Sequence, residues 1–365
     1  MLSIAPVDTD AGRRAMAAPG GFVWWYVDAV DADGNGCVII WSYGLPFLPG
    51  YASAERKGEA SEAAERPSLN VAVYRGGQLD CYLLREYSPE ETVWRPEEGY
   101  WRFGETEMQS RRREGRRRVS VALDCPIPGG DRRLRGTVEI AGPAPAIAGG
   151  TRMPNHRWSP RIVIGETGVD LRAGGTERYR SSGRGYHDAN CGVTPFHRLG
   201  IERWLWGRCP LPDRELVFYG LWPAGDGAPQ HRVLTFDADG DWHSERAVEF
   251  QLEGARRNIG GMRWWNTLRV TGPAAASWSP LEVEVRDVVD SGPFYMRYLT
   301  RSASATGVAE LIRPGRIDLA RHRPFVQMRV QRSGESNSAW LPLFSGPRRG
   351  RFRRLLDYNF GGGAG

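Results

Sequence analysis

Short runs of β-branched and aromatic residues, separated by glycine and proline, constrain the fold of this chain most strongly. Residues 21–28 and 36–43 flank a turn-rich connector, and 69–74 and 79–85 flank Gly76-Gly77, as in β-hairpins. We expect further strands at 99–103, 117–123, 134–140, 161–164, 203–206, 215–222, 231–236, 247–252, 262–270, 281–287, 294–300, 307–312 and 325–330. The best helical candidate is the short segment 53–64. The pattern therefore predicts an all-β protein, a sandwich or a barrel.

Length and a weak internal repeat indicate two units. A chain of 365 residues is long for one small core. Trp24-Trp25 recurs as Trp264-Trp265, which would fit two related β units. We predict an N-terminal domain at 1–197 and a C-terminal domain at 198–365.

The net charge of +6 comes almost entirely from arginine, and six arginines crowd into residues 111–118. The simplest interpretation of this run is a solvated hairpin turn with basic flanks. Peripheral contact with a membrane surface is the alternative, because arginine binds phosphate head groups. No nucleic-acid motif accompanies the run, so a nucleic-acid partner is not expected.

The cysteines and histidines favour a reduced protein without a structural metal. Five cysteines make an odd number without a Cys-x-x-Cys pair, and the six histidines lack zinc-ligand spacing. No apolar run approaches the roughly 18 residues that span a bilayer. Residues 1–21 contain acids and lack the apolar core of a signal peptide. We therefore expect a cytoplasmic protein, with membrane contact at most peripheral.

Residues 183–208 combine groups suited to proton transfer with indole side chains. Tyr186, His187, Asp188 and Asn190 lie between glycines, and a Trp-x-Trp-Gly strand follows from Trp204. Such residues suit a site that handles a proton in an apolar, aromatic pocket. The segment resembles the signature of the carotenoid 1,2-hydratase (hydroxyneurosporene synthase) family, which reads Tyr-His-Asp-His-Asn-Trp-Gly here.

Other segments extend this resemblance over most of the chain. Residues 24–28 resemble the family's opening Trp-Trp-Tyr-Phe-Asp. Residues 293–297 resemble its Pro-Phe-Tyr-x-Arg, and 307–310 resemble a following Gly-x-x-Glu. The resemblance implies two tandem lipocalin-like β-barrel or sandwich domains.

The resemblance also implies a hydro-lyase that adds water to a terminal alkene of an acyclic carotenoid. Hydration needs a general acid whose pKa is raised by burial, and one ordered water. It also needs aromatic faces, each of which stabilises a carbocation by roughly 0.5–2 kcal/mol. It requires no nucleotide, metal or redox cofactor. The expected partner is a hydrophobic polyene or isoprenoid substrate.

Asp188 is the predicted acid, and we expect His187 and Asn190 to orient it. The three predicted catalytic residues are Asp188, His187 and, on a downstream strand, Tyr219. The expected substrate-binding residues, on the signature and on strands rich in tryptophan, are Trp25, Tyr186, Asn190, Cys191, Trp204, Trp206, Trp222 and Trp265.

Three departures from the family pattern keep other functions open. Ala189 stands where the family has a second histidine, and Cys191 stands where it has tryptophan. The strand with Tyr219 lacks the aspartate of a family Tyr-x-Asp pair. One alternative is a cyclase or pericyclase of a polyene or polyketide, which depends mainly on pocket shape. A second is a non-catalytic lipid or pigment carrier.

Purely structural roles are also available to the same residues. Tyr186, His187 and Asp188 could bracket a tight turn, with Asp188 capping backbone N–H groups and His187 binding a carbonyl. Glu202, with Arg203 or Arg208, could form a surface salt bridge beside the Trp-x-Trp-Gly strand.

Overall fold

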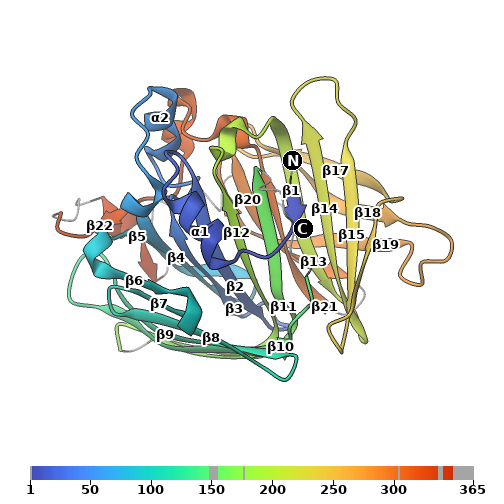
Figure 1. The fold of residues 1–365 in the computed structure, drawn as a ribbon, viewed down its shortest axis with the longest axis horizontal. Helices are drawn as coiled ribbons and strands as arrows, with labels where there is room; N and C mark the ends of the chain where they lie inside the picture. The colour runs from blue at the N-terminus through green and yellow to red at the C-terminus, as the bar shows by residue number, and fades with distance from the viewer. Residues whose placement is uncertain (1, 148–154, 176, 303–304, 336–339, 348–365) are drawn as a thin grey trace.

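A computed structural model describes residues 2–147, 155–175, 177–302, 305–335 and 340–347. Its strands form two curled, mostly antiparallel sheets that face each other (Figure 1). The first sheet runs in the order β22 (Gln331–Arg332), β5 (Gln78–Glu86), β4 (Pro67–Arg75), β3 (Gly36–Tyr43), β2 (Phe22–Val30), β12 (Glu177–Gly192), β11 (His156–Ala173), β10 (Arg133–Pro143), β9 (Arg116–Pro126), β8 (Thr106–Arg113), β7 (Tyr100–Phe103) and β6 (Thr92–Arg95), with β1 (Leu2–Ile4) beside β11 and β23 (Gly346–Pro347) beside β5.

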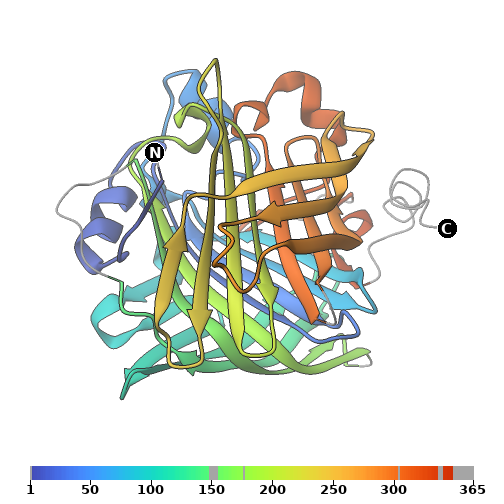
Figure 2. The same cartoon turned by 90° about the vertical axis from the view of Figure 1, so that its right-hand side faces the viewer.

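The second sheet comes from the later part of the chain and lies in front in Figure 2, yellow to orange. Its order is β16 (Trp242–Glu245), β15 (Gln230–Asp237), β14 (Arg214–Pro223), β13 (Ile201–Pro210), β21 (Ala305–Ile312), β20 (Tyr295–Ser302), β19 (Leu281–Ser291), β18 (Arg263–Thr271) and β17 (Glu249–Arg257). The helices are α1 (Thr9–Met16) and α2 (Tyr51–Arg56), and the short 3-10 segments are η1 (Ala63–Glu65), η2 (Pro89–Glu91), η3 (Pro96–Glu98), η4 (Phe196–Arg198), η5 (Pro314–Arg316), η6 (Ala320–Phe325) and η7 (Leu341–Leu343).

Apolar side chains of the described residues form three cores. One fills the curl of the first sheet and includes Trp25 and Trp101, and another fills the curl of the second sheet around Phe218. The third lies between the sheets, where Tyr186 of the first meets Trp206 of the second. Because β2 and the second half of β12, residues 185–192, are covered on both faces, their residues are buried almost without interruption.

The all-β prediction is confirmed, and so are both hairpins. Asp31 organises the β2–β3 turn, since its carboxylate accepts from the backbone N–H groups of Asp33 and Asn35 at 2.9 and 2.8 Å. Gly76 and Gly77, between β4 and β5, have φ of 55° and 79°, in the left-handed region that favours glycine.

Helices and the last expected strand differ from prediction. The helix expected at 53–64 is shorter, since α2 ends at Arg56, and α1 was not predicted. The prediction of a strand at 325–330 is wrong. Val326, Met328 and Val330 cover the core between the sheets without pairing to a sheet edge, so their alternation reflects packing alone.

The predicted division at 197/198 stays a prediction. β12 of the first sheet ends at Gly192 and β13 of the second begins at Ile201. The chain later returns to the first sheet through β22 and β23. Residues 348–365 of the predicted second domain lie outside the described residues.

Candidate active site

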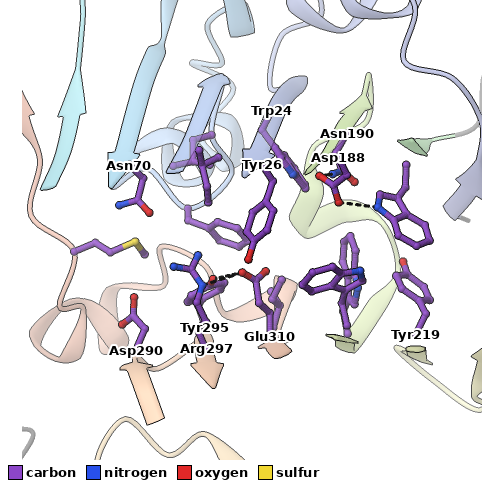
Figure 3. A pocket seen from close by; sticks show the side chains of 18 of the residues that line it. Trp24, Tyr26, Asn70, Asp188, Asn190, Tyr219, Asp290, Tyr295, Arg297 and Glu310 are labelled. Carbon is purple, nitrogen blue, oxygen red and sulfur yellow. Dashed lines mark hydrogen bonds and ion pairs between the residues drawn. The ribbon is translucent and has the colours of Figure 1, made fainter. Parts of the chain in front are cut away.

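A pocket lies between the two sheets, and two rows of paired residues face each other across it (Figure 3). On the first sheet, backbone pairing aligns Asn70, Ile40, Tyr26 and Asp188 across four strands. On the second, it aligns Tyr219, Trp206, Glu310 and Arg297 across four strands. All eight side chains line the pocket.

The cavity volume of this pocket is about 60 Å³. That is room for a few waters or the branched end of an alkene chain.

Asp188 is a buried carboxyl with three side-chain donors. Its Oδ2 accepts from the indole N–H of Trp158 at 2.7 Å and from the hydroxyl of Tyr186 at 2.8 Å. Its Oδ1 accepts from the amide of Asn190 at 2.9 Å. Burial raises the pKa of Asp188 to about 7, although the hydrogen bonds from Tyr186 and Trp158 act in the opposite direction. This carboxyl can therefore carry a proton near neutral pH.

A second polar chain fixes Asn190. Its Oδ1 lies 2.9 Å from Nε2 of His156, and an amide oxygen only accepts, so the proton of His156 is on Nε2. Burial lowers the pKa of His156 to about 3, which keeps the imidazole neutral. His156 thus acts as an anchor for Asn190, which in turn positions the Asp188 carboxyl. His156 was not among the predicted site residues.

Aromatic faces surround this carboxyl. Trp158 and Tyr219 stack at 6.0 Å with 15° between their planes, and Trp204 meets Tyr219 edge-on at 5.4 Å. Trp206 lies 5.3 Å from Tyr186. The Tyr219 hydroxyl is buried and has no hydrogen-bond partner among the described residues. It remains free to bond a ligand or a water.

Polar groups of the second sheet complete the pocket. Glu310 accepts from the Tyr295 hydroxyl at 2.8 Å and from Nε of Arg297 at 2.9 Å. Arg297 also donates to the Tyr74 hydroxyl at 3.1 Å, which ties this group to the first sheet. Tyr295, Arg297 and Glu310 were not among the predicted site residues. A signal was available, because they lie in the segments 293–297 and 307–310 that resemble the family.

Strand parity on β12 divides the predicted site residues between two faces. Tyr186, Asp188 and Asn190 face the pocket side, whereas Ala189 and Cys191 pack inside the curl of the first sheet. His187 has the strand parity of Ala189 and Cys191, so it points away from the pocket side. Its Nδ1 donates to the Tyr26 carbonyl at 2.9 Å. The structure therefore does not bring His187 or Cys191 together with the Asp188 carboxyl. The tight turn of the structural interpretation is wrong, because all these residues lie within strand β12, and the donors to Asp188 are side chains. Its expectation that His187 binds a carbonyl is confirmed.

The predicted tryptophans divide in the same way. Trp204 and Trp206 line the pocket, but Trp25 points into the first sheet's curl, and its neighbour Trp24 lines the pocket instead. Trp222 and Trp265 pack in the second sheet, where the guanidinium of Arg203 lies 3.9 and 4.7 Å from their ring centres.

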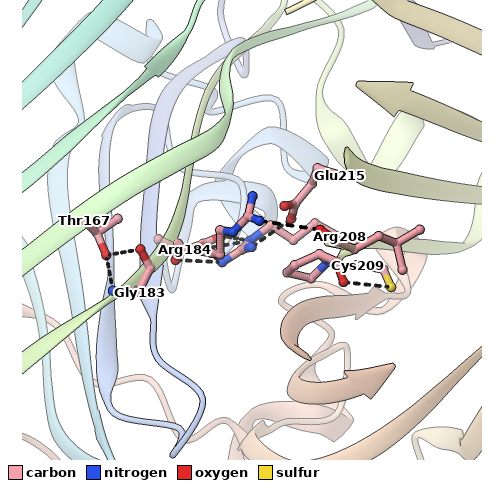
Figure 4. Close-up of polar contacts among 9 residues, drawn as sticks. Thr167, Gly183, Arg184, Arg208, Cys209 and Glu215 are labelled. Atoms are coloured by element: carbon pink, nitrogen blue, oxygen red, sulfur yellow. Dashed lines mark hydrogen bonds and ion pairs between the residues drawn. The ribbon is translucent and has the colours of Figure 1, made fainter. Parts of the chain in front are cut away.

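Arg208 differs most from expectation. Instead of forming a surface salt bridge, it is fully buried between the sheets (Figure 4). Its guanidinium donates to Asp28 at 2.5 and 2.9 Å and to Glu215 at 2.9 Å. Glu202 pairs with Arg313. The Arg208 network joins the two walls of the pocket.

In the described part of the chain, no three histidine, cysteine, aspartate or glutamate side chains gather as a metal site would require. The helices found among the described residues are too short and too polar to cross a bilayer.

Comparisons with known sequences match this chain to proteins of carotenoid metabolism. The model of the carotenoid hydratase CrtC family matches residues 39–338. A hydroxyneurosporene dehydrogenase of Chlorobaculum tepidum is 24% identical, over 92% of this chain and 94% of that protein. An acyclic carotenoid 1,2-hydratase of Rubrivivax gelatinosus is 30% identical, over 78% of this chain and 66% of that enzyme. The chain thus spans about two thirds of that hydratase's length.

Solved structures share the fold. An AttH-type protein of Nitrosomonas europaea superposes with a TM-score of 0.53 at 14% identity, over 80% of this chain and 92% of that one. CghA in complex with Sch210972 gives 0.52 at 12% identity, over 80% and 89%. At these identities the similarity concerns the fold alone, and it agrees with the predicted lipocalin-like class.

Proposed function

The chain belongs to the carotenoid hydratase CrtC family, and we propose that it adds water to a terminal alkene of an acyclic carotenoid. The observation that carries this proposal is the Asp188 carboxyl, protonatable near neutral pH, on the wall of a largely aromatic pocket. Alkene hydration needs such an acid in an apolar site.

In the proposed reaction, the Asp188 carboxyl gives its proton to the less substituted alkene carbon. The tertiary carbocation that forms on the other carbon is stabilised by the faces of Trp158, Trp204 and Trp206, each worth roughly 0.5–2 kcal/mol. Water adds to this carbon through its oxygen and releases a proton, which returns to the Asp188 carboxylate. One water is added and the acid is regenerated.

Two of the three departures from the family pattern lie outside this pocket. Ala189 and Cys191 pack on the other face of β12. Leu221 lies two residues after Tyr219, where the family's aspartate is expected, and belongs to the core between the sheets. Glu310 supplies a carboxylate nearby, since both it and Tyr219 pair with Trp206 of β13.

The test is an oxygen-free incubation of the protein with detergent-solubilised lycopene or neurosporene, followed by mass spectrometry for a gain of one water. We expect a product that is lost in Asp188→Asn. Asp170→Asn is the matched control, because Asp170 lies on the surface and pairs with Arg178. Turnover by Asp188→Asn would exclude Asp188 as the acid. Tight binding without turnover would favour cyclisation or carriage.

We also propose peripheral membrane contact through the β8–β9 hairpin, since a carotenoid substrate resides in a bilayer. Arg111, Arg113 and Arg116 are exposed there. Arginines near an anionic surface contribute roughly 1 kcal/mol each. We expect salt-sensitive co-sedimentation with phosphatidylglycerol vesicles that weakens in Arg111→Gln/Arg116→Gln. Equal sedimentation of wild type and variant would contradict this contact.

A further inference from the structure

A second cavity, which we name the arginine cavity, opens inside the curl of the first sheet. Its cavity volume is about 340 Å³, several times that of the pocket between the sheets, which is about 60 Å³. Three indoles and three guanidinium groups dominate its wall, from Trp25, Trp94, Trp101, Arg112, Arg117 and Arg161. It lies across the β2–β12–β11 wall from Asp188, and no step of the proposed hydration uses it.

Strand alternation explains how arginines reach the inside of the sheet. Arg112 of β8 pairs with Arg117 of β9, and both line the cavity. The neighbouring pair, Arg111 and Arg118, is exposed. The basic run is therefore a hairpin, as predicted. Arg117 is partly buried against the cavity, whereas Arg112 lines the mouth of the cavity and is exposed. Arg161 joins them from β11, beside an irregularity between Pro160 and Ile162.

The three cations of the arginine cavity have no described carboxylate partner. Arg161 donates to the Val7 carbonyl at 2.8 Å, and Arg117 donates to the Ser110 hydroxyl at 2.9 Å. Nε of Arg117 is buried without a hydrogen-bond partner. Burial lowers the pKa of Arg161 to about 10, and the neighbouring charge of Arg117 acts in the same direction. Arg117 and Arg161 are both half-buried. Like charges that are partly removed from water without a counter-ion are costly, and a bound anion would relieve that cost.

The indoles offer an apolar surface together with unused donors. Trp25 lies 5.2 Å from Trp101 and 5.8 Å from Trp94, so the three rings form one continuous wall. The N–H groups of Trp94 and Trp101 are buried and find no acceptor among the described residues. A ligand with an apolar body and several acceptor oxygens would satisfy both features.

We propose that the arginine cavity binds an organic oxyanion, a carboxylate or phosphate attached to a compact aromatic or apolar body. Guanidinium groups match both head groups through paired N–H donors, and the indoles cover the body. The acidic residue at the described rim, Asp8, caps α1 and is exposed, so it leaves the interior positive. This site is independent of the proposed hydration.

The test is calorimetric titration of the full-length protein with 2-naphthoate and with its uncharged analogue 2-naphthamide. We expect 2-naphthoate to bind at least tenfold more tightly. 2-Naphthyl phosphate in the same titration distinguishes the head groups, and tighter binding of either anion than of the amide supports the site. Equal affinity for 2-naphthoate and 2-naphthamide, or equally tight binding of inorganic phosphate alone, would overturn it.

Variants locate the ligand. Arg117→Gln and Arg161→Gln should each weaken 2-naphthoate binding at least tenfold, whereas Arg117→Lys should retain more affinity. Arg111→Gln is the matched control, because Arg111 lies on the same hairpin and is exposed. Trp206→Phe, in the pocket between the sheets, should leave binding unchanged. Loss of binding in Arg111→Gln or Trp206→Phe would contradict the assignment, and melting curves would identify any variant that fails to fold.

Discussion

Replacing Arg208 by methionine should destabilise the protein more than any surface change of equal size. Arg208 is fully buried, and so are both of its carboxylate partners, Asp28 and Glu215. It also donates to the backbone carbonyl of Arg184 at 3.3 Å. One guanidinium thus connects β2 and β12 of the first sheet to β13 and β14 of the second.

The expected cost follows from what Arg208→Met leaves behind. Breaking a buried ion pair by removing one partner costs about 3–5 kcal/mol, since the other charge stays buried without compensation. Here two carboxylates lose their cation, so we expect the upper part of this range at pH 8. Arg208→Met combined with Asp28→Asn and Glu215→Gln should recover most of the loss, because no buried carboxylate then remains.

The pH dependence has a definite sign. Burial raises the pKa of Glu215 to about 7, above its unfolded value, and it also raises the pKa of Asp28. A raised pKa stabilises the native state below the unfolded pKa, and this contribution is lost as the pH rises through about 7. Without Arg208 both pKa values rise further. The deficit of Arg208→Met should therefore be largest above pH 7 and shrink on acidification.

Urea unfolding at pH 5.5 and pH 8, followed by tryptophan fluorescence, measures this deficit. Arg208→Lys is the control that keeps the charge but loses the fork of donors, and we expect an intermediate loss. A deficit below about 1 kcal/mol at pH 8, the size expected of an exposed pair, would refute the reasoning. So would a deficit that grows on acidification.

Three further predictions follow from burial. Because burial raises the pKa of Asp188 to about 7, hydration should fall about tenfold per pH unit above that value; a flat pH–rate profile would contradict the assigned acid. Ala189→His should cost about 1–3 kcal/mol in urea unfolding and leave turnover no higher, since Ala189 is fully buried away from the pocket; increased turnover would show otherwise. All five cysteines are buried, and the pKa of Cys191 is raised to about 12, so iodoacetamide should label the protein only in denaturant; mass spectrometry of the native protein checks this.

The strands were predictable where one face is buried or where a turn carries a clear signal. β9 and β10, which were both predicted, alternate between buried and more exposed residues, and the Gly76-Gly77 turn fixes the β4–β5 hairpin. The first part of β8 shows a similar alternation but was not predicted. β12 was not predicted as a strand, because both faces of its second half, residues 185–192, are covered and because Gly183 and Gly185 resemble turn residues. The edge strands β22 and β23 are two residues long and depend on pairing with β5.

The site was predictable where side-chain chemistry identifies a residue, but not where its role depends on which face of a strand it occupies. Asp188, Asn190, Trp204 and Trp206 were identified by their chemistry and all line the pocket. Which tryptophan of the pair 24–25 faces the pocket depends on strand parity relative to the second sheet, and hydropathy does not distinguish two buried faces. Arg208 gave no sequence signal of burial, since its partner Asp28 lies 180 residues away.

Strand β12 relates the two cavities to each other. Its even-numbered residues hold the Asp188 carboxyl on the pocket side, whereas Ala189 and Cys191 lie inside the curl of the first sheet. Burial lowers the pKa of His187, and the positive charges of Arg161 and Arg117, which line the arginine cavity, act in the same direction. Nε2 of His187 has no hydrogen-bond partner among the described residues. An anion bound by these arginines would oppose their effect on the pKa of His187, a residue that the proposed hydration does not use.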